Sequence, residues 1–80
     1  MKPTTIAERL NALILVLGHN PNSFSNAIDV IPQTTHKILK GRNNPGFEYL
    51  AKILTKFPQV NARALITGEG PLILGKNREI

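Results

Sequence analysis

Four polar side chains recur at a spacing of three and four residues, which places them on one face of an α-helix: Gln33, His36, Lys37 and Lys40. A glutamine can pair through two hydrogen bonds with the N6 and N7 edge of adenine, and a lysine can donate to O6 and N7 of guanine. A histidine can donate or accept, depending on its tautomer. On one exposed helix, this set has the chemistry to read the edges of DNA bases. The competing interpretation is an ordinary solvated helix face.

Polar residues on both sides of this set suit the oxygens of a phosphate backbone. The residues after Lys40 are polar or basic, and the helix that precedes the set begins with free amides and a positive dipole end, which favour an anion. Such contacts fix the register of a protein on DNA rather than read its sequence. We predict phosphate contacts from Asn20, Asn22, Ser23, Thr34, Lys40, Arg42, Asn43 and Asn44.

The charge balance agrees with a polyanionic partner. Ten Lys and Arg stand against five Asp and Glu, for a net charge of +5 and a pI near 10.1. Between residues 30 and 63, Glu48 is the only acid among six basic residues. Three of these, Lys52, Lys56 and Arg63, are interpreted as solubilising charges, with contact to DNA as the alternative.

Composition argues against several other classes of function. The chain of 80 residues has no cysteine, two histidines, two serines and one aspartate, so neither a metal site nor a catalytic triad has the groups it needs. No glycine pattern resembles a phosphate-binding loop. We therefore expect no enzyme activity, cofactor or metal. The longest apolar run, Leu13 to Leu17, is too short to cross a bilayer, and no signal-peptide pattern is present, so we expect a cytoplasmic protein without a membrane partner.

Hydrophobic periodicity predicts an all-α domain of five helices, over residues 6–17, 21–28, 32–40, 47–57 and 62–67. Thr5 and Glu8 form a capping box at the first, and Gly18 ends it. In the third helix, the inner face is predicted to hold Thr34, Thr35, Ile38 and Leu39. In the fourth, the predicted inward residues are Phe47, Leu50, Ala51, Leu54 and Phe57. His19 is interpreted as a bystander in a loop.

The second and third helices are joined by a tight turn in which Asp29 occupies a position that glycine or asparagine usually fills. Two short helices joined in this way are typical of the helix-turn-helix, in which the second helix lies in the major groove of DNA. A major groove about 12 Å wide admits one α-helix with its side chains.

The stretch from Ile6 to Leu72 resembles the lambda-repressor-like DNA-binding domain of the phage repressor and Cro family. The matching segments are 24–28, Val30, 38–41, the Gly-Arg-Asn-Asn-Pro loop with its Phe47-Glu48-Tyr49-Leu50 helix start, and Leu65-Ile66-Thr67-Gly68-Glu69-Gly70-Pro71-Leu72. The resemblance implies a homodimer on a palindromic operator, usually with repression of transcription. It places base-reading positions at Pro32, Gln33, His36 and Lys37, and phosphate contacts at Pro21, Asn22, Arg42, Asn43 and Asn44.

Three residues depart from the family pattern: Asp29 replaces the turn glycine, Ile31 the polar helix cap, and Pro32 a polar side chain. They favour the alternative hypothesis of a protein-interaction module or antitoxin that keeps the fold without binding DNA. Residues 1–70 are predicted to form the domain, and 71–80 a tail or the start of a linker to a further domain. Within it, Leu72, Ile73 and Leu74 either fold back over the core or form a dimer contact.

Overall fold

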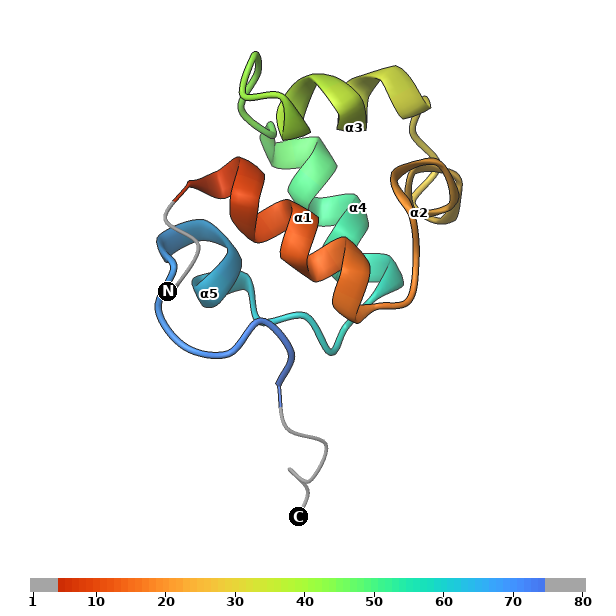
Figure 1. The fold of residues 1–80 in the computed structure, drawn as a ribbon. Helices are drawn as coiled ribbons and strands as arrows, with labels where there is room; N and C mark the ends of the chain where they lie inside the picture. The colour runs from red at the N-terminus through yellow and green to blue at the C-terminus, as the bar shows by residue number, and fades with distance from the viewer. Residues whose placement is uncertain (1–4, 75–80) are drawn as a thin grey trace.

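The computed structural model describes residues 5–74 and is all-α over this range, which confirms the predicted fold class at that level (Figure 1). Its helices are α1 (Ile6–Val16), α2 (Pro21–Ala27), α3 (Pro32–Leu39), α4 (Phe47–Lys56) and α5 (Ala62–Thr67). Every helix begins at the predicted residue. The first four end one residue earlier than predicted, because the residue predicted to be last is in each case the C-cap.

The core is a single cluster to which every helix contributes. Its most deeply buried large side chains are Leu10, Leu13, Ile14, Phe24, Ile38, Ile53 and Leu65. In Figure 1, α1 crosses the middle of the molecule, with α3 and α5 on opposite sides of it. α1 contacts α2, α3 and α5, and α2 packs against α3. Since α1 is the common neighbour of α2, α3 and α5, its stripe of leucine and isoleucine holds these three helices in place.

The N-terminal ends of α1 and α2 are closed by reciprocal side-chain caps. Thr5 Oγ1 accepts from the backbone N–H of Glu8, and the Glu8 carboxylate accepts from the N–H of Thr5, which confirms the predicted capping box. Asn20 and Ser23 repeat this arrangement at α2. By contrast, Ile31 at the N-cap of α3 makes no side-chain capping bond.

The C-terminal ends of the first three helices share a tight closure around a residue with positive φ. At α2 this residue is Asp29, with φ of 63°. The N–H of Val30 donates to the carbonyl of Ser25, and that of Asp29 to Asn26, which is the pattern of a Schellman motif. Gly18 and Gly41 close α1 and α3 with the same two bonds. Among residues 5–74, Asp29 is thus the one non-glycine residue with a positive φ, and it lies in the turn between α2 and α3.

The chain after α5 folds back toward the core. Val60 and Ile73 form an isolated antiparallel bridge, and the N–H of Leu74 donates to the carbonyl of Gln59 at 2.8 Å. Leu72 and Ile73 pack against the core, whereas Leu74 remains 48% exposed. Folding back over the core is therefore observed for Leu72 and Ile73, and a dimer contact through these residues stays a prediction. Positions 75–80 of the predicted tail lie outside the described residues.

The predicted inner face of α4 is wrong at one residue. Phe47 is 85% exposed, and the fully buried positions are Tyr49 and Ile53. Phe47 lies about 160° around the helix from Tyr49, so both cannot face the core. Leu50, Leu54 and Phe57 are partly buried beside this pair, as predicted. Tyr49 takes the central place because its hydroxyl meets a polar partner inside the domain.

Candidate nucleic-acid interface

The outer face of α3 carries the predicted base-reading side chains together. Gln33, His36, Lys37 and Lys40 are exposed, while Thr35 and Ile38 on the opposite face are buried. The exposed four and Arg42 line a shallow concavity of about 250 Å³. This arrangement brings amide, imidazole and cationic groups to one surface, where they can donate hydrogen bonds to an anionic or polar partner. Pro32, the fourth predicted base-reading residue, is half-buried at the start of the helix.

One side-chain hydrogen bond joins α2 to this face. His36 Nε2 lies 3.3 Å from Oδ1 of Asn22, on the first turn of α2. If the amide oxygen is the acceptor, His36 carries its proton on Nε2, which leaves Nδ1 as an acceptor. This bond therefore joins the exposed sides of α2 and α3, the two helices that are predicted to contact DNA.

The other predicted phosphate residues of α2 are engaged in the cap of that helix. Asn20 Oδ1 accepts from the N–H of Ser23, and Ser23 Oγ accepts in turn from the N–H of Asn20. His19 Nδ1 lies 2.9 Å from Ser23 Oγ, and its ring meets Phe24 and Phe57 edge-on. His19 is thus a packing residue rather than the bystander of our interpretation. Thr34 is half-buried on α3, and Pro21 is half-buried at the start of α2.

The loop after α3 extends the basic surface. Gly41, with φ of 79°, ends the helix, and the N–H of Arg42 donates to the carbonyl of Lys37 at 2.9 Å. The side chains of Arg42, Asn43 and Asn44 are exposed. The N–H of Asn43 also lies 3.4 Å from the carbonyl of Lys37, so Arg42 and Asn43 directly follow the outer face of α3.

A chain of three buried hydroxyls anchors α3 from beneath. Ser25 Oγ lies 2.7 Å from Thr35 Oγ1 and 2.7 Å from the carbonyl of Pro21, and Thr35 Oγ1 lies 2.9 Å from the hydroxyl of Tyr49. Ser25 Oγ is placed to donate to Thr35 Oγ1 or to the carbonyl of Pro21, and in the bond between Thr35 and Tyr49 either hydroxyl can be the donor. Burial raises the pKa of the Tyr49 phenol above its ordinary value of 10.0, an effect that the Thr35 hydrogen bond partly offsets.

This hydroxyl chain links α2, α3 and α4, and the sequence interpretation missed its role. Thr35 and Ser25 are fully buried, and Tyr49 is 6% exposed. Thr35 is predicted from the sequence to lie on the inner face of α3, and its buried position agrees with this. The sequence feature that could have revealed the hydroxyl chain is a threonine at an inward position of a short helix, because a buried hydroxyl needs a polar partner.

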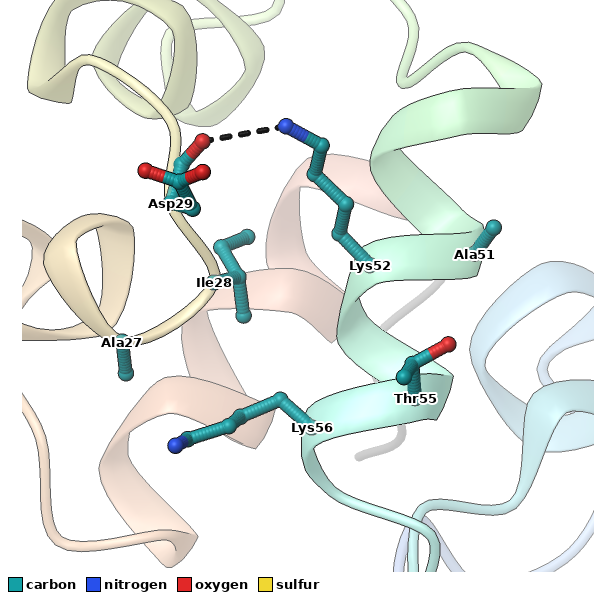
Figure 2. Close-up of a pocket in the computed structure, with 7 residues that line it drawn as sticks. All are labelled: Ala27, Ile28, Asp29, Ala51, Lys52, Thr55 and Lys56. Atoms are coloured by element: carbon teal, nitrogen blue, oxygen red, sulfur yellow. Dashed lines mark hydrogen bonds between the residues drawn. The ribbon is translucent and has the colours of Figure 1, made fainter.

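The turn between α2 and α3 is supported from α4. Lys52 Nζ donates to the backbone carbonyl of Asp29 at 3.0 Å, as Figure 2 shows. A cleft of about 400 Å³ lies beside this contact, with Ile28 between Lys52 and Lys56 in the view. Lys52, interpreted from the sequence as a solubilising charge, therefore also holds the turn that orients α3.

Two arginines have structural contacts. Arg63 pairs with Glu69 at 3.2 Å on the surface, with both side chains largely exposed. Arg9 is 9% exposed and donates through Nε to the carbonyl of Leu65 at 2.8 Å and through Nη2 to that of Ile66 at 2.9 Å. A cation at the last carbonyls of α5 is stabilised by the helix dipole. The sequence interpretation did not single out Arg9.

Over residues 5–74, no helix is both long and apolar enough to cross a membrane. The same range holds no group of three or more His, Cys, Asp or Glu side chains placed to bind a metal ion. No protein-family model matches the chain, and searches of curated proteins and of solved structures likewise return no match. The resemblance to the phage repressor and Cro family therefore stays a prediction from the sequence.

Proposed function

We propose that this chain is a sequence-specific double-stranded DNA-binding protein that uses α3 as its reading helix. The observation that carries the proposal is the exposed face of α3, on which Gln33, His36, Lys37 and Lys40 share a concavity with Arg42. An α-helix with its side chains is about 10–12 Å in diameter, which suits a major groove about 12 Å wide.

In this proposal, α2 and α3 form a helix-turn-helix of the phage repressor and Cro type. Gln33 pairs with adenine, Lys37 donates to guanine, and His36 takes either role. Lys40, Arg42, Asn43 and Asn44 hold the phosphate backbone. The hydroxyl chain and Lys52 support it, because they fix α3 and its turn before DNA is met and so lower the cost of ordering the reading face on binding.

We further propose that two copies bind a palindromic operator and act as a repressor. One α3 reaches only a few base pairs, and a symmetric dimer doubles the site, with half-sites about 34 Å apart along the DNA. Sedimentation with and without operator DNA tests the stoichiometry. A single copy bound to an asymmetric site would contradict the dimer without removing the DNA-binding proposal.

Selection of bound duplexes from a random pool tests the proposal directly. We expect a recovered motif with two-fold symmetry, and affinity that falls steeply with salt, because each neutralised phosphate adds about −0.9 to the logarithmic slope. Gln33→Ala or Lys37→Ala should lose about 1–3 kcal/mol of preference at one base position, whereas Arg42→Ala should weaken binding to every sequence alike. Arg63→Ala is the matched control, since Arg63 pairs with Glu69 and belongs to α5, which lies on the opposite side of α1 from α3 in Figure 1.

The outcome against the proposal is equally specific. No binding to any duplex at low ionic strength, combined with a stoichiometric protein partner on co-purification, would favour the protein-interaction module instead.

A further inference from the structure

Ile31 stands immediately before α3 with most of its side chain in solvent. It is 62% exposed, and its backbone is extended, with φ of −73° and ψ of 143°. The N-cap position favours serine, threonine, asparagine or aspartate, whose side chains accept from the free N–H groups of the first turn. Isoleucine provides no such bond, and its exposure means that it contributes little to the core. The residue thus gives the domain less stability than a polar residue would at the same place.

A residue that breaks a local rule without a gain in packing is expected where function requires it. The next residue, Pro32, has no N–H, and the polar part of the outer face begins only at Gln33. The start of α3 is therefore apolar, while the rest of its outer face is polar. In the major groove, the one apolar group on a base edge is the C5-methyl of thymine, and apolar side chains recognise it by contact.

We infer that Ile31 recognises the C5-methyl group of a thymine beside the base read by Gln33. This inference rests on the proposed function, because it requires α3 to enter the major groove with its N-terminal residues toward the bases. It adds a specificity-determining contact that uses no hydrogen bond. The recovered half-site is therefore expected to contain a thymine at this position.

Replacement of single thymines by deoxyuridine tests the inference, since this change removes the methyl group and leaves the hydrogen-bonding groups intact. In the recovered operator, we expect the substitution at one thymine per half-site to weaken binding by about fourfold, which corresponds to about 0.8 kcal/mol for one buried methyl group. For Ile31→Ser, the same substitution is expected to change affinity by less than about 1.5-fold. The introduced serine side chain can cap α3, so the thermal midpoint of this variant should be at least that of the parent protein.

Val16→Ser is the matched control, because Val16 on α1 is 60% exposed, close to the value for Ile31. It should keep the full penalty for deoxyuridine. A half-site without thymine, or an equal penalty in the parent protein and Ile31→Ser, would overturn the inference while leaving sequence-specific binding intact. Failure of the parent protein to bind any duplex would overturn the proposed function and the inference with it.

Discussion

Replacement of Thr35 by valine isolates the contribution of the buried hydroxyl chain, because valine keeps the shape of threonine and removes its oxygen. Ser25 Oγ would still reach the carbonyl of Pro21 at 2.7 Å. The Tyr49 hydroxyl would lose its partner at 2.9 Å while the side chain stays 6% exposed. A buried donor left without a partner costs about 1–3 kcal/mol. Since 1 kcal/mol shifts the midpoint of a domain of this size by about 4–8 °C, a loss of about 2 kcal/mol lowers it by about 8–16 °C.

The double variant gives the sharper test, because Tyr49→Phe is expected to change the free energy of unfolding in opposite directions in the parent and in Thr35→Val. Tyr49→Phe alone should cost about 0.5–1.5 kcal/mol, since Thr35 keeps Ser25 as a partner. Added to Thr35→Val, the same change should instead restore stability by about 1 kcal/mol, because it removes the orphaned hydroxyl. Urea unfolding followed by circular dichroism measures all four proteins. If Tyr49→Phe destabilises the Thr35→Val protein as much as it does the parent, the two hydroxyls are not coupled and the reasoning fails.

Three further predictions concern single groups. Because burial raises the pKa of Tyr49, the unfolded state binds fewer protons than the folded state above pH 10, and the free energy of unfolding falls with rising pH. Tyr49→Phe should flatten that fall, and tyrosinate absorbance measures the titration of Tyr49 directly because the chain has one tyrosine. Asp29→Gly should raise the free energy of unfolding by about 1 kcal/mol, because glycine adopts the φ of 63° without strain, whereas Asp29→Ala should not raise it. A higher thermal midpoint for both variants would instead show that loss of the charge is responsible. Arg9→Met keeps the apolar stem but leaves two carbonyls of α5 without their donor, so we expect a loss of at least about 2 kcal/mol in urea unfolding, and an unchanged value would show that water replaces the guanidinium.

The sequence was sufficient to predict the helices because their signals are local. Capping residues, Pro21 and Pro32 at helix starts, and the stop at Gly18 act within one turn of the chain. The exposed face of α3 follows from the same periodicity, and the structure agrees with it residue by residue. These signals do not determine whether that face binds DNA, because binding depends on contacts with a second molecule.

The parts that the sequence did not reveal are contacts between distant residues. Periodicity could not separate Phe47 from Tyr49 as the inward residue of α4, because the choice depends on Thr35 of another helix. Arg9 reads as a surface charge on α1 until α5 brings its carbonyls alongside. Nor does any local pattern mark Lys52 as a support for Asp29.

The clamp between Arg9 and Leu65 has a consequence for how the molecule folds. It joins residues 56 positions apart, so α1 cannot complete its contacts until α5 has formed. Closing a loop of that length is entropically costly, and contacts of wide sequence separation slow folding relative to purely local helical pairs. A nascent chain that had emerged only as far as α4 would hold the guanidinium of Arg9 without its carbonyl acceptors. Folding of the first and last helices is thus expected to be one cooperative event, so that hydrogen exchange protects both together.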